Sequence, residues 1–198
     1  CSDYVSGLVK INEFMKLKRK IPNKKFIIFL GSSIGNFDPK DAMDFLHSIA
    51  RCVRKDDLLL IGIDLEKDKS ILDRAYNDKN GITAKFNFNV LARINRELEG
   101  EFNISNFEHK SFYNTHKHRI EMHLESKVDQ QVRIGAIGKM FYFKKGETIH
   151  TENSYKYSLP RLNKLVKKAG LQVIRNFTDP NIHYTLILLK KVSNATKS

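Results

Sequence analysis

The 198-residue sequence has few cysteines and no long apolar run, and these absences exclude several classes of protein. Its two cysteines, Cys1 and Cys52, are too few for a disulfide framework and lack the CxxC spacing of a zinc or redox site. The longest apolar runs, at 26–31 and 58–63, have strand length and fall far below the roughly 18 residues of a membrane span. The composition predicts a soluble globular protein, and the scarcity of cysteine favours a reducing, cytoplasmic setting.

Acidic residues are also scarce, since 22 Asp and Glu face 35 Lys and Arg for a formal charge of +13. The positive charge is concentrated in the run at 16–25, which lacks the interleaved aromatic residues of many nucleic-acid-binding surfaces. We interpret this run as a solvated connection, and a basic nucleic-acid-binding module remains the alternative. Because the chain begins with Cys1 and has no signal-peptide pattern, we expect it to be part of a longer protein.

The first third of the chain has the pattern strand, loop, helix, strand. The apolar block 26–30 is typical of a buried parallel strand, and Asp38 and Pro39 suit the start of a helix. Apolar residues recur at helical spacing through 42–53, and a second apolar block at 58–63 ends at Asp64. This order predicts an α/β fold.

The C-terminal segment continues the same sheet with a different strand direction. Ser158 suits the start of an amphipathic helix that ends at Gly170, and strands follow at 171–177 and 184–189. The turn at 179–181 predicts a hairpin, so at least one strand is antiparallel and the sheet is mixed.

The middle of the chain predicts an inserted α+β lobe at 67–156, which leaves 1–66 and 157–198 to form the main domain. Two helices are expected at 70–78 and 82–98. The second has an apolar face made of Phe86, Val90, Leu91, Ile94 and Leu98. Four short antiparallel strands are expected at 107–113, 119–125, 131–137 and 140–143.

Two polar segments are candidates for chemistry. The loop at 31–36 follows a strand of an open α/β sheet, where ligands bind, but it lacks the Lys of a phosphate-binding P-loop. The segment at 146–157 is dense in polar side chains, and residues 151–154 could hold a small substrate with a donor and an acceptor, such as an imidazole. The alternatives are an ordinary turn and a solvated loop.

Neither a metal site nor a hydrolase triad is indicated. His116 and His118 are expected in a turn between strands and His47 in a helix, and no cysteine or carboxylate completes a tetrahedral set at the usual spacing. No serine lies in a GxSxG nucleophile motif. We therefore expect no metal cofactor.

Eight motifs occur in a fixed order along the chain. They are FLGSSIGNFD (29–38), IDLEKD (63–68), AYND (75–78), GITAKFNFNVL (81–91), NREL (95–98), FEH (107–109), RIEMHL (119–124) and TENSYK (151–156). Together they closely resemble the histidine-specific Nα-methyltransferases of ergothioneine biosynthesis. The resemblance covers nearly the whole chain, from residue 3 to the final hairpin.

The resemblance implies an enzyme that uses S-adenosyl-L-methionine to trimethylate the α-amine of histidine, giving hercynine. It also implies a Rossmann-like methyltransferase domain with an inserted substrate-binding lobe. Members of the family begin with the glycine-rich strand, turn and helix that hold the cofactor, and about 100 residues of this kind are not in the sequence. The sheet is therefore expected to be incomplete, the chain alone to be inactive, and its exposed sheet edge to allow self-association.

The resemblance also assigns roles at the cofactor side of the site. Asp3 and Tyr4 correspond to an acidic and aromatic pair that borders the adenine, and Gly31 to a cofactor-binding position. Ser33 and Asn36 fall where the methyl donor meets the amine, and Asn36 corresponds to the residue that holds the α-amino group. Ser33 stands where threonine is common in the family.

The remaining roles concern the substrate. Tyr76 resembles a binder of the carboxylate, Glu152 and Ser154 resemble the pair that recognises the imidazole, and Met122 and Phe86 would form walls of the pocket. Residues 153–155 belong to a segment that varies among subgroups of the family, so another amino or imidazole compound remains an alternative substrate.

The expected chemistry agrees with these residue types. In-line methyl transfer needs a neutral amine aimed at the methyl group from about 3 Å, so that positioning supplies much of the rate. An amide such as Asn36 can orient an amine without protonating it, and a carboxylate such as Glu152 favours an imidazole N–H donor. No metal is required by this chemistry.

Overall fold

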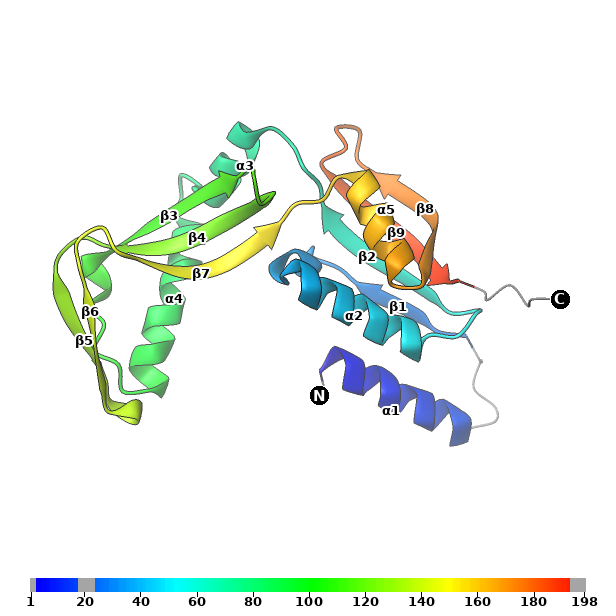
Figure 1. The fold of residues 1–198 in the computed structure, drawn as a ribbon, viewed down its shortest axis with the longest axis horizontal. Coiled ribbons are helices and arrows are strands. Elements are labelled where there is room, and N and C mark those ends of the chain that lie inside the picture. Colours follow the sequence, from blue (N-terminus) through cyan, green and yellow to red (C-terminus); the bar gives the residue numbers. More distant parts are fainter. Residues whose placement is uncertain (1–2, 18–23, 193–198) are drawn as a thin grey trace. The chain divides into compact units, whose positions relative to one another are not determined.

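The computed structural model describes residues 3–17 and 24–192, and the chain divides into two compact units. Unit 1 comprises residues 1–66 and 155–198, and unit 2 comprises residues 67–154. Unit 2 is inserted into unit 1 along the chain (Figure 1). Its C-terminal boundary lies two residues before the one expected from the sequence. None of the helices in the described part of the chain combines the length and apolar character that a membrane span requires.

Unit 1 alternates helices and strands in the order that its sequence predicts. Its elements are α1 (Tyr4–Leu17), β1 (Phe26–Phe29), the 3₁₀ helix η1 (Ser33–Asn36), α2 (Pro39–Cys52), β2 (Leu58–Asp64), α5 (Leu159–Lys168), β8 (Leu171–Thr178) and β9 (Tyr184–Lys191). The expected α/β fold is confirmed.

In the described part of unit 1, four strands form one mixed sheet in the order β1-β2-β9-β8. β1 and β2 are parallel, and Ile28 pairs with Leu60. β9 is antiparallel to both of its neighbours, β2 and β8. The predicted C-terminal hairpin and the mixed sheet are therefore confirmed.

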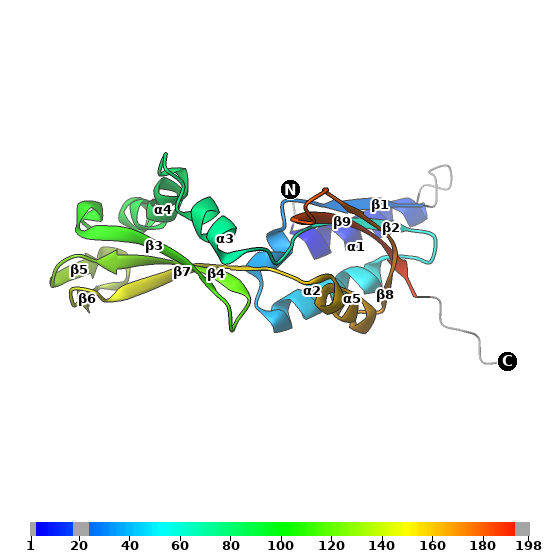
Figure 2. The same ribbon diagram turned by 90° about the horizontal axis from the view of Figure 1, so that it is seen from above.

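Helices α1, α2 and α5 all lie on the same side of this sheet (Figure 2). The core lies between these helices and the sheet, and alternate residues of the strands contribute to it. In β2, Leu59, Ile61 and Ile63 are buried, whereas Leu58 and Leu60 are only half-buried. From α2, Leu46 and Ile49 belong to the same core. The amphipathic pattern of the sequence thus determined which face of α2 is buried.

Two expectations for the N-terminal part of unit 1 were wrong or incomplete. β1 is parallel as expected but is not buried on both faces, since Phe26 and Ile28 remain 56% and 55% exposed. Among the described residues no helix covers that face, and no strand pairs with the other edge of β1. In addition, α1 was not anticipated, because its apolar residues Val9, Ile11 and Phe14 are exposed and form no clear helical stripe.

Unit 2 contains two helices and five strands. They are α3 (Lys69–Tyr76), α4 (Ile82–Glu97), β3 (Phe107–Asn114), β4 (Arg119–Ser126), β5 (Gln130–Ile134), β6 (Lys139–Phe143) and β7 (Thr148–Tyr155), with 3₁₀ turns at η2 (Ile104–Asn106) and η3 (Gly135–Ile137). β3, β4 and β7 form one sheet in that order, and β5 and β6 form a hairpin.

The structure corrects three details in unit 2. The polar segment at 146–157 is largely a strand, because β7 pairs with β4 instead of looping through solvent. The strand expected to reach residue 137 ends at Ile134, where η3 begins. On α4, Leu91 is buried as expected together with Asn87, whereas Phe86 is exposed.

Candidate active site

The loop after β1 is joined to the end of β2 in unit 1. Because β1 and β2 are parallel, their carboxyl ends meet at the same edge of the sheet. Gly31 and Ser32 both have positive φ, of 78° and 56°, which turns the chain sharply after the strand. The Ser32 hydroxyl then accepts a hydrogen bond of 2.8 Å from the backbone N–H of Asp64. This strained turn is thus held in place by the neighbouring strand.

A buried lysine that was not among the predicted site residues lies against the same edge. Lys156 is 1% exposed, and its Nζ lies 2.8 Å from Oδ2 of Asp64. One residue earlier, the Tyr155 hydroxyl donates to Oδ1 of Asp38 at 2.8 Å. A lysine between two tyrosines, Tyr155 and Tyr157, is the signal that could have indicated a buried cation. These contacts attach the segment that follows β7 to the loops after β1 and β2.

Tyr184, the first residue of β9, contacts the same turn. A Cβ atom at Gly62 would lie 2.0 Å from the Tyr184 hydroxyl oxygen, so only glycine leaves room for this ring. Burial raises the pKa of Tyr184, although hydrogen bonds from the backbone of Gly31 and Ser32 oppose that effect. The phenol therefore contacts the turn that follows β1.

The residues predicted for the cofactor side all lie in unit 1. Asn36 is exposed at the end of η1, and the Ser33 hydroxyl contacts the carbonyl of Leu30 at 3.5 Å. Asp3 precedes α1, where its Oδ1 accepts hydrogen bonds from the N–H groups of two residues in the first turn. These bonds, above all the one from Ser6, lower the pKa of Asp3. Tyr4 is 61% exposed.

Tyr4 is positioned by other aromatic rings of unit 1. Its ring packs edge-on against Phe29, with 5.1 Å between the ring centroids, and against Phe45 at 6.0 Å. The start of α1 is therefore anchored next to the end of β1, although much of the Tyr4 ring stays accessible.

In unit 2, the structure brings together two predicted substrate-binding residues that are 78 positions apart. The Tyr76 hydroxyl, at the end of α3, donates to Oγ of Ser154 in β7 at 2.9 Å. Ser154 is buried and Tyr76 is half-buried. The pair is thus rigid on one side and accessible on the other, which suits the recognition of a polar ligand.

Hydrogen bonds to β3 fix the position of Tyr76. Nε2 of His109 lies 3.0 Å from the carbonyl oxygen of Tyr76, and Nδ1 lies 3.0 Å from Nδ2 of Asn87. In the tautomer with its proton on Nε2, His109 donates to Tyr76 and accepts from Asn87. The Asn77 amide also donates to the carbonyl of Ser111 at 3.1 Å. The last turn of α3 is therefore fixed to β3.

The other predicted substrate residues differ in their surroundings. Met122 is 3% exposed and belongs to a small core with Leu72, against which Tyr76 packs. Glu152 is half-buried in β7, two residues before Ser154. Phe86 lies on α4 with 64% of its surface exposed.

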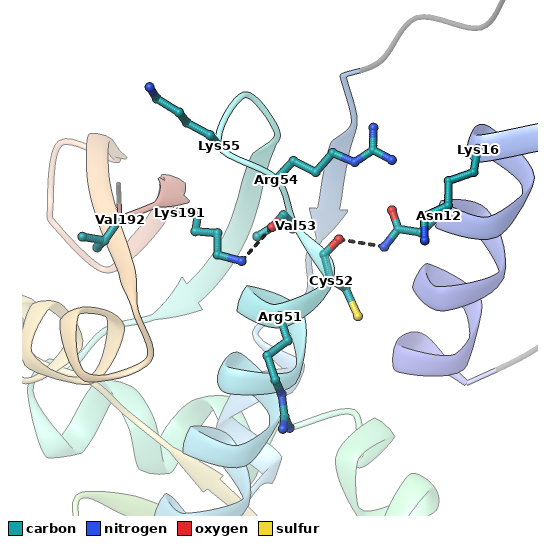
Figure 3. A pocket seen from close by; sticks show the side chains of 9 residues that line it. All are labelled: Asn12, Lys16, Arg51, Cys52, Val53, Arg54, Lys55, Lys191 and Val192. Atoms are coloured by element: carbon teal, nitrogen blue, oxygen red, sulfur yellow. Dashed lines mark hydrogen bonds between the residues drawn. The ribbon is translucent and has the colours of Figure 1, made fainter. Parts of the chain in front are cut away.

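A separate hollow of about 560 Å³ contains none of the predicted site residues (Figure 3). It lies at the C-terminal end of α2, whereas Gly31 and Asp64 lie at the opposite ends of the strands that flank α2. Asn12 donates to the carbonyl of Cys52 at 2.9 Å and Lys191 to that of Val53 at 3.2 Å. The two side chains donate to backbone carbonyls at the C-terminal end of α2, which lack partners within the helix. We therefore interpret the residues around the hollow as stabilising this helix end.

The basic run at 16–25 is only partly covered by the structure, because residues 18–23 lie outside the described residues. One member, Lys25, is not solvated as expected. Its side chain is 7% exposed and lies 2.8 Å from the carboxylate of Asp57, whose own side chain is 0% exposed. Lys25 also donates to the side chain of Asn12. This lysine joins α1 to the start of the sheet.

Comparison with known proteins identifies relatives over nearly the whole chain. Residues 1–191 match the model of the family described as histidine-specific, SAM-dependent methyltransferases. The histidine N-alpha-methyltransferase of Mycobacterium tuberculosis is 42% identical over 191 residues, which are 96% of this chain and 57% of that protein. Ergothioneine biosynthesis protein 1 of Schizosaccharomyces pombe is 31% identical over 87% of this chain and 22% of its own length.

A relative with another named substrate also matches. The L-tryptophan methyltransferase of Psilocybe serbica is 30% identical over 92% of this chain and 51% of its own length. The chain thus spans little more than half the length of the relatives from Mycobacterium tuberculosis and Psilocybe serbica.

Proposed function

The chain belongs to the family of histidine-specific, SAM-dependent methyltransferases, and from this membership we propose that the whole protein transfers methyl groups to the α-amine of histidine. The observation that carries the proposal is the 42% identity to a histidine N-alpha-methyltransferase over 96% of the chain. We further propose that the product is trimethylated and that the protein works in the cytoplasm, where its free cysteine Cys52 would stay reduced.

S-adenosylmethionine would supply an electrophilic methyl group. The turn after β1 is suited to such a ligand, because Gly31 at φ 78° brings bare backbone to the edge of the sheet and Asn36 is exposed beside it. Gly31, Asp3 and Tyr4 would hold the cofactor. Tyr4 presents an exposed aromatic ring for stacking.

Asn36 and Ser33 would orient the amine. An amide oxygen accepts a hydrogen bond from an amine N–H without giving up a proton, so the nitrogen keeps its lone pair. Because the reaction is an in-line displacement, the benefit of these groups is mainly positional. Asp64 and Lys156 would keep the turn in place through their ion pair and the bond from Asp64 N–H to Ser32.

Unit 2 would recognise the rest of the substrate. Tyr76 would bind the carboxylate, and Glu152 and Ser154 would bind the imidazole, with Met122 and Phe86 as apolar walls. The 2.9 Å contact between the Tyr76 and Ser154 hydroxyls supports this assignment, because it places two of the proposed substrate-binding side chains next to each other. A site that hydrogen-bonds the imidazole would discriminate against side chains without such groups.

The decisive experiment uses the complete gene product, incubated with histidine and S-adenosylmethionine and analysed by mass spectrometry. We expect mono-, di- and trimethylated histidine to accumulate. When the methyl group of the donor is deuterated, the deuterated methyl groups should be found on the α-nitrogen. The 198-residue chain serves as the control and is expected to be inactive. Absence of methylated histidine from the complete protein would contradict the proposal.

Another amino acid is the second candidate substrate, because the relative from Psilocybe serbica is named for tryptophan. A competition assay with equal concentrations of histidine, tryptophan and other imidazole compounds distinguishes the candidates. We expect histidine to be consumed first. If tryptophan were methylated preferentially, tryptophan and not histidine would be the substrate.

We also infer that the open edge of β1 has a partner. Phe26, Ile28 and Leu30 are each at least half exposed, and unpaired strand edges favour association with further strands. In the whole protein, the additional residues that the longer relatives possess would pair with the open edge of β1 and cover these exposed side chains. The isolated chain would instead self-associate. We assign no nucleic acid or membrane as a partner.

A further inference from the structure

Three potential metal ligands converge in unit 2, on the sheet formed by β3, β4 and β7. Glu121 and His123 lie two residues apart in β4, so their side chains project from the same face of the strand. His150 comes from the neighbouring strand β7. One possible ligand atom from each of these residues lies within 4.8 Å of the other two.

His123 is half-buried, but both of its ring nitrogens are buried and have unmet hydrogen-bonding capacity. Within the described part of the chain, neither of its ring nitrogens has a hydrogen-bond partner. Its Nε2 lies 3.5 Å from Oε2 of Glu121, without the geometry of a hydrogen bond. A buried polar group without a partner costs about 1–3 kcal/mol, so it calls for a ligand or an ordered water molecule.

The rings around His123 hold it firmly. Its imidazole lies between Phe112, with the centroids 5.6 Å apart and the planes 8° apart, and His150, at 4.5 Å and 14°. A neutral imidazole with an unshared lone pair is the form that binds a metal ion.

Glu121 is held in place by cations on its other oxygen. Oε1 lies 2.8 Å from Nε of Arg119 and 3.7 Å from Nζ of Lys117, whereas Oε2 is the oxygen beside His123. These contacts orient the carboxylate, as is common for carboxylates that bind metal ions.

We propose that Glu121, His123 and His150 form a binding site for one divalent transition-metal ion. Two imidazoles and one carboxylate are the ligand set of many zinc sites and also suit nickel or copper, whereas magnesium and calcium prefer oxygen ligands alone. Solvent would occupy the remaining coordination positions. The proposal does not depend on the methyl-transfer reaction.

Metal binding requires one local adjustment. Ligand atoms bound at about 2.0–2.2 Å from zinc lie about 3–3.5 Å from one another, so the group must contract. The lone pairs of stacked rings run nearly parallel, and His150 must therefore turn out of the stack to aim at the ion. His150 is exposed, so this rotation meets little packing resistance.

The test is a titration of the 198-residue chain with ZnCl₂ by isothermal calorimetry, supported by the absorption spectrum with CoCl₂. We expect one ion per chain and a Co²⁺ spectrum typical of four or five ligands. His150→Ala is expected to weaken Zn²⁺ binding at least about tenfold, since loss of even an indirect partner of a metal ligand costs that much. Because His150 is exposed, this variant should retain its circular dichroism spectrum and melting temperature.

His116→Ala is the matched control, because His116 is an exposed histidine of the same unit outside the cluster. It should bind Zn²⁺ as tightly as the unmodified chain. Glu121→Gln provides a second variant, expected to lose affinity because the amide is a much weaker ligand. The proposal is overturned if the unmodified chain binds no Zn²⁺, if His150→Ala binds as tightly as the unmodified chain, or if His116→Ala loses affinity equally.

Discussion

Tyr76 shows how a single hydroxyl can connect two distant segments of the chain. Its O–H donates to Ser154 at 2.9 Å, and its ring packs against the core that contains Met122. The ring and the hydroxyl thus have separable roles. Substitution by phenylalanine removes the hydroxyl and leaves the packing almost unchanged.

We predict that Tyr76→Phe in the complete protein raises the KM for histidine about two- to tenfold, because a net hydrogen bond contributes about 0.5–1.5 kcal/mol. The kcat should change less, since the hydroxyl positions the substrate and takes no part in methyl transfer. Steady-state kinetics measures both. Tyr142→Phe, on an exposed tyrosine of β6, is the control and should leave both constants unaltered. An unchanged KM in Tyr76→Phe would remove Tyr76 from the binding site.

The ion pair of Lys25 and Asp57 is a second effect at this scale. Burial would raise the pKa of Asp57, but hydrogen bonds from Lys25 and from the backbone of Arg54 outweigh it and hold the pKa below its ordinary value. A carboxyl with a depressed pKa in the folded state stabilises the protein above its unfolded pKa. That stabilisation is lost as the pH falls through the folded pKa.

We predict that Asp57→Asn lowers the free energy of unfolding by about 3 kcal/mol at pH 7, because it leaves Lys25 buried without its counter-ion. The difference from the unmodified chain should shrink as the pH falls below about 4, because Asp57 is then protonated first in the unfolded chain and, at its lower pKa, in the folded protein. Urea unfolding at pH 7 and pH 3 measures both effects. Asp56→Asn, at the exposed neighbouring position, should change stability little at either pH. A constant difference at the two pH values would refute the linkage.

At the scale of elements, α3 is stabilised by its contacts with β3 more than by its own helical hydrogen bonds. The helix has only eight residues, which is marginal for an isolated helix. Side-chain bonds compensate at its C-terminal end, where His109 bonds to the carbonyl of Tyr76 and Asn77 to that of Ser111. Asp73 also accepts from the backbone N–H of Tyr113 at 2.8 Å.

We predict that His109→Leu lowers the free energy of unfolding by about 1–3 kcal/mol, since Asn87 and the Tyr76 carbonyl each lose a partner. In the complete protein it should also raise the KM for histidine, because the last turn of α3 carries Tyr76. His109→Gln retains a donor and an acceptor and should restore part of both properties. Thermal unfolding and kinetics test this prediction. A normal KM in a destabilised His109→Leu variant would show that the role of His109 is structural alone.

α4 illustrates a second effect at this scale. Asp78 accepts hydrogen bonds from the N–H groups of Thr83 and Ile82, which lower its pKa to about 2. The acidic residue in the motif AYND thus satisfies free donors at the start of a helix. Its presence in a shared motif therefore has a structural explanation.

At the scale of the whole molecule, the described helices of unit 1 all lie on one side of its sheet. Residues Phe26 and Ile28 of β1 and Ile174 and Phe177 of β8 remain substantially exposed. Open α/β sheets normally carry helices on both faces. The chain spans 57% of its relative from Mycobacterium tuberculosis, which provides further residues that could cover the open face.

We predict that the 198-residue chain self-associates at tens of micromolar and that Ile28→Lys reduces this association by placing a charge on the open face of β1. Sedimentation velocity over a range of concentrations measures the effect. Ile82→Lys is the control, because Ile82 is 66% exposed, similar to the 55% of Ile28, but lies on α4 in unit 2. A monomeric chain at all concentrations, or equal effects of both substitutions, would contradict the prediction.

Local sequence patterns were sufficient for most elements. The stripe on α2 and the apolar blocks of β1 and β2 predicted the α/β fold, because hydrophobic periodicity reports which face of an element is buried. The ordered motifs also indicate the family from the sequence alone, since they occur in a fixed order along the chain. β7 was not recognised as a strand, because polar side chains in a sheet depend on a partner strand that local sequence does not reveal.

Only the tertiary structure decided which distant residues meet. The pairs Tyr76 with Ser154, Asp64 with Lys156 and Lys25 with Asp57 join positions far apart in the sequence. The same is true of the cluster of Glu121, His123 and His150, whose strands are adjacent only after folding. Residue types and local periodicity determine elements and suggest chemistry, but contacts between elements arise from the packing of the whole unit. For this reason the sequence predicted the family, and the structure identified which side chains hold its candidate site together.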